Sequence, residues 1–340
     1  MLLLGAGISV AADPPQVPRP KPTRGDEPVA KAWSAAKAAA YLDGVGVNWT
    51  RDRQCVTCHT NMPYLFARPL LKGAPDAGWK EVRKFLEDDV KSWSNGGKPK
   101  GDAYVVATAA ALAVSDARTT GRLHPATKTA LDRMWTVQRK GGDWNWLKCD
   151  WPPLEHDDFY GAVLAAVAVA EAPDKYAETE KAKAGIEGLQ AYFAKTPSPD
   201  LHHSAWLLWA SSKVDGLMTA EQKKTTVTEL KQLQRREGGW CLPGLGKYNR
   251  RDEKKTPNDP DTVSDGYATG LAVFALRQAG VPVEDQAIRG GVMWLKEHQR
   301  ESGRWYTRSL NNDKAHYITN AGTAFAVMAL ASCGEKPAAR

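Results

Sequence analysis

The residues with the most specific chemistry lie near the N-terminus. Cys55, Cys58 and His59 form the pattern C-x-x-C-H, which is typical of covalent c-type haem attachment. Two intervening residues place both thiols on one side of a helical turn, where they can add to the two vinyl groups of a haem. His59 follows directly and is expected to be the proximal iron ligand. The pattern therefore predicts one covalently bound haem c.

Zinc binding and thiol redox chemistry fit these two cysteines less well than haem attachment. Zinc normally needs a second Cys or His pair at similar spacing, and the sequence has none. A thioredoxin-type redox pair needs a βαβ context, which this chain lacks. A structural disulfide between Cys55 and Cys58 stays open. Cys149 and Cys241 each follow a tryptophan at a comparable position, so an oxidising compartment could join them.

The N-terminal region predicts export. Residues 1–12 read MLLLGAGISVAA, an apolar run ending in small residues that is typical of a signal peptide. Residues 13–28 contain six prolines and should form an extended tether. The folded domain is expected at residues 29–333, followed by a tail at 334–340. We therefore expect a periplasmic or secreted protein, which agrees with haem attachment outside the cytoplasm.

Composition sets the class of protein and its partners. The chain has 340 residues, of which 42% are hydrophobic and 25% charged, enough for one large folded domain. The only unbroken apolar run is the short one at the N-terminus, so no transmembrane span is expected. The net charge of +7 favours an acidic redox partner, whose identity the sequence does not show. Binding of nucleic acid is not supported, because the paired basic residues lie in polar sequence without interleaved aromatics.

A repeat organises most of the chain. The pattern Q-x3-G-x-W occurs at Gln138–Trp144, Gln234–Trp240 and Gln299–Trp305. Each copy closes an amphipathic helix and is followed, after a loop, by a helix rich in small apolar residues. Similar pairs are expected before the first repeat and between the first two. The first of these pairs should have an outer helix at 29–43 and an inner helix from Gln54, with Trp49 in a degenerate motif.

Six such pairs predict an all-α fold with little sequence left for strands. Helices crowded with Ala, Gly and Val must be enclosed by other helices, and the charged amphipathic ones should surround them. We expect a single-domain (α/α)6 toroid of six outer and inner helix pairs. An open solenoid of the HEAT type is the structural alternative, because helix-pair repeats need not close into a ring.

The repeats resemble the QW motifs of the squalene-hopene cyclase and terpene cyclase/mutase family. That family shares its toroid with protein prenyltransferase β-subunits, and the resemblance covers about residues 29–330. It implies that the motif's Gln and Trp tie outer helices together. It also implies a cavity for an apolar small-molecule substrate. A prenyltransferase-like zinc site at Cys241, Asp265 and His316 is a weaker implication, since the His-Thr-Cys-Tyr signature of those subunits is absent.

The resemblance also supplies the alternative function. Family cyclases protonate an alkene with an Asp in a D-x-D-D-T-A stretch. The nearest segment here, Glu155–Tyr160, keeps the final acid pair but changes the other residues. The alternative is therefore a terpene cyclase or isomerase that uses Asp157 and Asp158 as general acid.

Inner helices that all run the same way would gather their N-termini at one mouth. Five of the seven histidines fall at these N-termini: His59, His156, His202, His203 and His316. His316 is the first candidate for the sixth iron ligand, because the last inner helix adjoins the first when the ring closes. His203 is the second candidate and Met62 the third. If the iron stays open, His316, His203 or Asp157 would serve in acid-base chemistry.

Beside the cyclase alternative, three functional classes with a haem remain from the sequence. The first is an electron carrier and the second is a haem-dependent oxidoreductase. The third is a haem sensor, for which the basic loop at residues 242–263 would be a docking surface.

Overall fold

A computed structural model describes residues 16–73, 76–149, 151–252, 258–259 and 262–335. The expected signal peptide at 1–12, parts of the basic loop and most of the C-terminal tail lie outside these ranges. The described residues form twelve α-helices and no strand apart from two isolated β-bridges. The outer helices are α1 (Ala35–Arg53), α3 (Ala77–Ser94), α5 (Pro125–Thr136), α7 (Glu180–Lys195), α9 (Ala220–Gln232) and α11 (Gln286–Glu297). The inner helices are α2 (Asn61–Ala67), α4 (Asp102–Thr119), α6 (Asp158–Glu171), α8 (Leu201–Ser211), α10 (Gly266–Gln278) and α12 (Ile318–Ser332).

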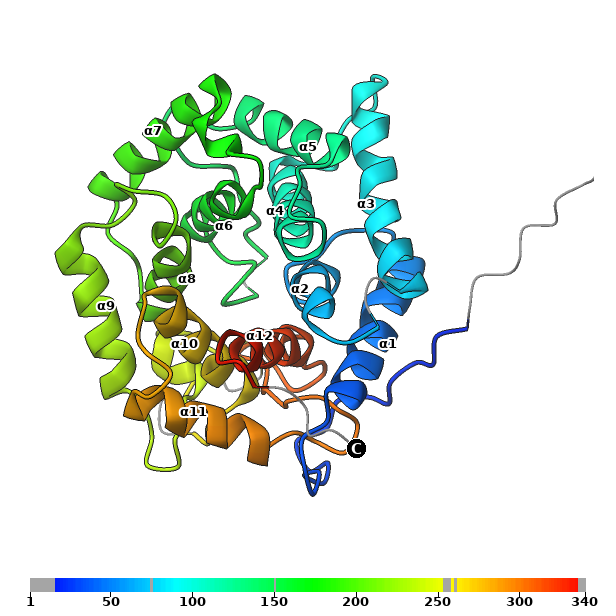
Figure 1. Ribbon diagram of the computed structural model, residues 1–340, viewed down its shortest axis with the longest axis vertical. Coiled ribbons are helices and arrows are strands. Elements are labelled where there is room, and N and C mark those ends of the chain that lie inside the picture. Colours follow the sequence, from blue (N-terminus) through cyan, green and yellow to red (C-terminus); the bar gives the residue numbers. More distant parts are fainter. Residues whose placement is uncertain (1–15, 74–75, 150, 253–257, 260–261, 336–340) are drawn as a thin grey trace, which may run out of the picture.

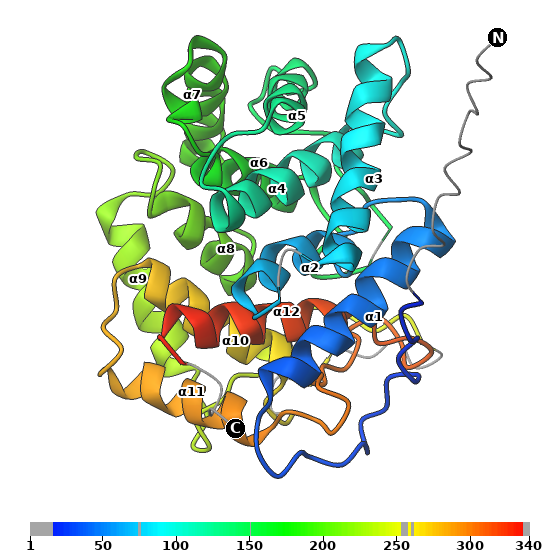
Figure 2. The same cartoon turned by 45° about the vertical axis from the view of Figure 1, so that its right-hand side comes forward.

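The inner helices form a closed ring. Each contacts the next in chain order, from α2 through to α12, and α12 returns to contact α2. The outer helices surround this ring (Figure 1), and α12 lies between α10 and the α1–α2 pair (Figure 2). The predicted (α/α)6 toroid is therefore confirmed, and the closed contacts exclude an open solenoid.

Small residues allow the inner helices to pack closely. Nearly every residue of α6 and α12 is buried, which fits helices enclosed on all sides. A Cβ atom added at Gly270 in α10 would lie 2.6 Å from the backbone of Ala326 in α12. Larger side chains at such positions would push the inner ring apart.

The Q-x3-G-x-W motifs join neighbouring outer helices. In the last copy, Gln299 Nε2 donates to the carbonyls of Gly303 and of Ser34, the residue that caps α1. Trp305 Nε1 donates back to the Leu295 carbonyl of α11 at 2.7 Å. The other two copies repeat this pattern with α7 and α11 as the next helices. The third copy therefore closes the ring.

The first helix pair differs from the prediction. α1 runs ten residues beyond the expected end at residue 43, so Trp49 lies inside the helix rather than in a degenerate motif. Its end is marked by Gln54, which adopts a left-handed conformation with φ of 47°. Gly44 and Gly46 do not end the helix. They let it pack closely, because an added Cβ would lie 2.7 Å from Pro20 and 2.6 Å from Tyr64.

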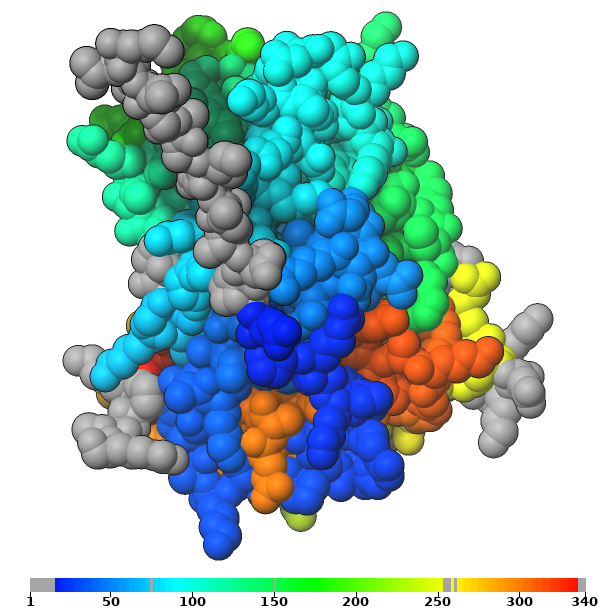
Figure 3. Space-filling view, turned by 90° about the vertical axis from the view of Figure 1, so that its right-hand side faces the viewer, coloured from blue at the N-terminus to red at the C-terminus, as the bar shows by residue number. Residues whose placement is uncertain are grey.

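The described part of the Pro-rich region packs against the toroid. Arg304, which is 2% exposed, pairs with Glu27 at 2.9 Å and donates to Thr23 Oγ1 at 2.8 Å. Arg300 donates to the Glu27 carbonyl. Figure 3 shows this segment, in the darkest blue, against the outer surface beside the orange residues of the last loop. The segment therefore covers the seam where the ring closes.

No α-helix among the described residues combines the length and apolar character needed to cross a bilayer.

Candidate functional site at the mouth of the toroid

The N-terminal ends of the inner helices meet, as the sequence predicts. Asn320 of α12 donates to Thr60, which precedes α2, at 3.0 Å. Asp157 at the start of α6 lies 3.2 Å from His203 of α8. His202 of α8 and Tyr267 of α10 are joined by a 2.8 Å hydrogen bond. Polar contacts, most of them between buried side chains, thus join the N-terminal ends of separate inner helices at the mouth.

The C-x-x-C-H residues lie in a turn between α1 and α2 rather than inside the inner helix. The side chain of Asn61, which is fully buried, orders this turn. Its Oδ1 accepts from the Thr57 amide and its Nδ2 donates to the Cys55 carbonyl, both at 2.8 Å. Sequence reasoning missed Asn61, although its place two residues after His59 marks it as the start of the next helix.

The thiols of the motif differ in exposure. Cys58 is 3% exposed, whereas Cys55 is half-buried. Burial raises the pKa of Cys58 well above its ordinary value, and the charge of Glu155 adds to this effect. No disulfide links the five cysteines, all of which lie in the described residues. Cys149 is exposed and Cys241 is buried.

The imidazole of His59 has a fixed orientation. Its Nδ1 lies 2.7 Å from Thr60 Oγ1, while its Nε2 faces Glu155 at 3.9 Å. The ring stacks on Tyr317 with centroids 5.2 Å apart and packs edge-on against Trp49 at 4.9 Å. Burial lowers the pKa of His59 to about 4, so the ring is neutral at pH 7. A neutral imidazole with one nitrogen held by a hydrogen bond is the form that ligates metals.

A small apolar pocket adjoins His59. It has a volume of about 150 Å³ and is lined by the segment Trp151–Glu155 together with Tyr317 and Ile318. Pockets for cofactors and drug-sized ligands usually measure about 300–1,000 Å³. Two thiols and a neutral imidazole fit the donor set of a c-type haem. The pocket as it stands is smaller than a group of that size.

The remaining candidates for the sixth ligand lie further from this pocket or are engaged elsewhere. His316 sits on the rim, where its Nδ1 accepts from the Ser309 amide at 3.1 Å. Because the unprotonated nitrogen of His316 bonds the Ser309 amide, His316 would have to give up this bond to bind an iron. Tyr317, the next residue, is the one that faces His59. Met62 is fully buried within α2.

Asp157 and Asp158 have different partners. Asp157 caps α6 through the Tyr160 amide and pairs with His203. Burial raises the pKa of Asp157, but His203 outweighs burial and holds that pKa below its usual value. Asp158 accepts from Arg139 at 2.8 Å and from the Trp146 amide at 3.0 Å. This arrangement does not favour the two carboxylates as a joint general acid.

His203 lies between two carboxylates. Its Nδ1 is 2.6 Å from Asp200 Oδ1, and its Nε2 faces Asp157. Burial opposes the charged ring, yet the two carboxylates raise the pKa of His203 to about 9. Burial lowers the pKa of the neighbouring His202 to about 3. Sequence reasoning missed Asp200, whose position directly before Leu201, the first residue of α8, is that of a helix cap.

Comparisons with known proteins agree with this architecture. Residues 157–314 match the family model of the squalene-hopene cyclase C-terminal domain, which is somewhat less than half of the chain. Among solved structures, 35 chains match. One is a polysaccharide lyase with 11% sequence identity and a TM-score of 0.53, over 90% of this chain and 99% of that chain. At this identity the likeness shows the fold alone. No curated protein sequence matches the chain significantly. The chain is thus similar to the C-terminal domain of squalene-hopene cyclases in somewhat less than half of its length, and its described residues as a whole form an α/α toroid.

Proposed function

We propose that this chain is an exported c-type haem protein in which Cys55 and Cys58 bind one haem c and His59 is the proximal ligand. One observation carries the proposal: the C-x-x-C-H turn lies at the mouth, and His59 is neutral, held at Nδ1 and part of the lining of a pocket, with its Nε2 3.9 Å from Glu155. The haem would supply one-electron redox chemistry when bound.

The surrounding residues suit a fixed axial ligand. Thr60 holds Nδ1 of His59, which orients the ring and leaves Nε2 for the iron. Trp49 and Tyr317 contact the ring from two directions and limit its rotation. Asn61 fixes the backbone that carries both cysteines. These contacts join α1, the turn before α2 and α12, so the toroid itself sets the position of the ligand.

Electron transfer is the function that the position of the pocket supports best. Trp151 and Tyr317 line the pocket and are 38% and 39% exposed, so a redox group there would lie near the surface. The nearby histidines are engaged elsewhere: His316 by the Ser309 amide and His203 by two carboxylates. The net charge of +7 favours an acidic redox partner. A haem-dependent oxidoreductase is the alternative within the same proposal.

Cysteine variants test the attachment. The full chain would be produced with its N-terminal signal in a host that exports and matures c-type cytochromes, then extracted with acidic acetone. We expect the Soret band to stay with the wild-type polypeptide and with Cys333→Ala, a half-buried cysteine far along the chain. It should be lost in the Cys55→Ala/Cys58→Ala double variant. A band that is extracted equally from all three proteins contradicts the proposal.

Carbon monoxide separates the two haem functions. An electron carrier in which His316 exchanges its bond to the Ser309 amide for the iron would have six ligands, and its ferrous spectrum should not change under carbon monoxide. A spectrum that shifts on exposure indicates an open iron, and the oxidoreductase alternative would then replace electron transfer.

A further inference from the structure

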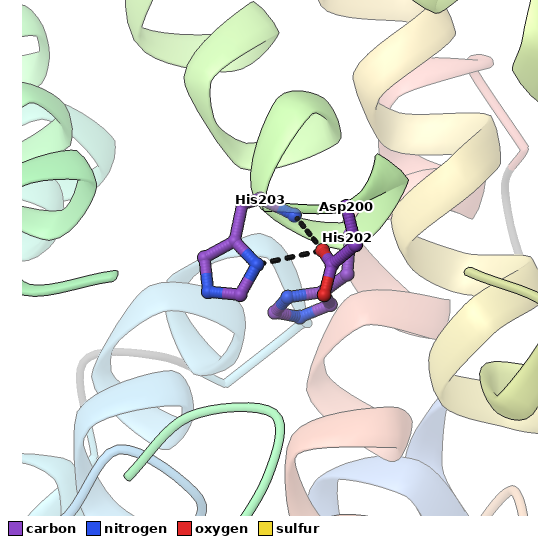
Figure 4. Close-up of side chains that lie close together, drawn as sticks. All are labelled: Asp200, His202 and His203. Atoms are coloured by element: carbon purple, nitrogen blue, oxygen red, sulfur yellow. Dashed lines mark hydrogen bonds and ion pairs between the residues drawn. The ribbon is translucent and has the colours of Figure 1, made fainter. Parts of the chain in front are cut away.

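We propose that Asp200, His202 and His203 form a second site, which binds one divalent transition-metal ion such as Zn²⁺ or Co²⁺. Each residue offers one ligand atom, and the three atoms lie within 4.8 Å of one another. Figure 4 shows the two rings and the carboxylate converging at the start of α8. Two imidazoles and one carboxylate are a common ligand set for these ions. The site uses no residue of the C-x-x-C-H turn and goes beyond the proposed haem function.

Buried polar atoms without partners mark this place. His202 and His203 are 0% and 1% exposed. Nδ1 of His202 is buried and makes no hydrogen bond, and the hydroxyl of Tyr160 beside it is in the same state. The Tyr160 ring stacks on that of His202 with centroids 6.3 Å apart. Buried nitrogens and hydroxyls are almost always satisfied. An unpartnered imidazole nitrogen among polar groups therefore indicates a missing ligand.

The histidines have the outer partners that metal-binding histidines need. Tyr267 Oη bonds His202 at Nε2, which leaves Nδ1 for a metal. Asp157 Oδ2 lies 3.2 Å from His203 Nε2, an ion-pair distance without hydrogen-bond geometry, and Nδ1 of that ring is the nitrogen that faces Asp200. Metal-bound histidines typically have such a partner on their second nitrogen, and it fixes both tautomer and orientation. Each ring therefore has a partner near the nitrogen that would not bind the metal: Tyr267 for His202 and Asp157 for His203.

The carboxylate is held in the same way. Tyr248 donates to Asp200 Oδ2 at 2.6 Å, so Oδ1 remains for the site. Oδ1 now accepts from His203 Nδ1 at 2.6 Å, and the proton of this bond occupies the place between the two atoms. Metal bonds of about 2.0–2.2 Å in a tetrahedron would set these atoms about 3.4 Å apart. A carboxylate shift of less than about 1 Å is enough, and the proton leaves to solvent as the metal binds.

The binding test uses zinc and cobalt, because a haem contributes only iron to the metal content. The full chain would be treated with chelator, desalted and titrated with Zn²⁺ by calorimetry, and the bound metal counted by mass spectrometry. We expect one Zn²⁺ per chain. His202→Gln should abolish binding at this site, while His298→Gln should not, since His298 stacks on Trp294 at the end of α11. Asp157→Asn should weaken binding about 10–100-fold through the loss of the outer partner.

X-ray absorption of the wild-type zinc complex covers the case in which a variant fails to fold. We expect a first shell of nitrogen and oxygen with the scattering of two imidazoles. Sulfur scattering in that shell would show that cysteines bind the zinc, and this result would overturn the proposal. The proposal is also overturned if zinc does not bind stoichiometrically, or if folded His202→Gln protein binds zinc as tightly as wild type. Either result would mean that Asp200, His202 and His203 form a buried ion pair only. None of these outcomes depends on haem, so the two proposals fail separately.

Discussion

Substitution of Gly303 by alanine tests how the ring is closed. Gly303 has φ of +94°, and an added Cβ would lie 2.2 Å from the carbonyl oxygen of Lys37 in α1. The α1 backbone would have to retreat by about 1 Å to restore an ordinary contact. Gln299 bonds both Gly303 and the Ser34 carbonyl before α1, so the same movement strains the tie between the last and first outer helices.

The expected loss follows from three terms. A left-handed conformation costs alanine about 1–2 kcal/mol relative to glycine. Overpacking against a rigid backbone costs about 1–3 kcal/mol, and each weakened hydrogen bond about 1 kcal/mol. Together they predict a loss of roughly 3–6 kcal/mol in the free energy of unfolding. Gly280→Ala is the matched control, because Gly280 has φ of +82° but no atom within 4 Å of the added Cβ. Gly280→Ala should therefore lose only the about 1–2 kcal/mol that the left-handed conformation costs alanine.

The assay is urea unfolding followed by circular dichroism, with both variants compared to wild type at equal m-value. The difference between Gly303→Ala and Gly280→Ala isolates the contact with α1 from the backbone conformation. If the two variants lose the same stability, the close approach of this glycine to α1 contributes nothing and the reasoning is refuted.

Four further substitutions have defined outcomes. Gln234→Ala removes the donor to two backbone carbonyls and should lower the free energy of unfolding by about 2–3 kcal/mol in the same urea assay; unchanged stability would contradict its role as a tie. Tyr160→Phe removes a buried hydroxyl that makes no hydrogen bond, so in metal-free protein stability should stay equal or rise by about 1 kcal/mol. Tyr267→Phe, which loses bonds to His202 and Trp206, should be destabilised in parallel, and the reverse order would be inconsistent with these contacts. Thr60→Val should shift the haem reduction potential in a potentiometric titration, since Nδ1 of the proximal histidine loses its partner, and an unchanged potential would argue against that bond.

The architecture was predictable because it is encoded locally and repeatedly. Each Q-x3-G-x-W motif specifies a helix exit and a tie to the next helix, and Ala-rich segments specify the inner positions. The limits of α1 were not predictable, because Gly44 and Gly46 resemble helix-ending residues in sequence. Their actual role, close packing on Pro20 and Tyr64, depends on segments that come together only in the fold.

The candidate site also has one part that could be predicted from the sequence and one part that could not. Cys55, Cys58 and His59 are neighbours in sequence, so the proposal of haem attachment could be made from their pattern alone. Asp200 caps α8 and reaches His203 within one helical turn, so this contact is local in sequence. Tyr267 belongs to α10, and only the closed ring brings its side chain to His202. The pairing of Asp157 with His203 also depends on two helices that lie side by side. No spacing in the sequence specifies these two contacts between helices.

The most direct test of the central claim is mass spectrometry of the peptide that contains Cys55 and Cys58, from protein matured in a host competent for c-type cytochromes. The proposal predicts that this peptide carries the added mass of one haem on the two cysteines. An unmodified peptide, or one lighter by two hydrogens because the two sulfurs are bonded to each other, would contradict it.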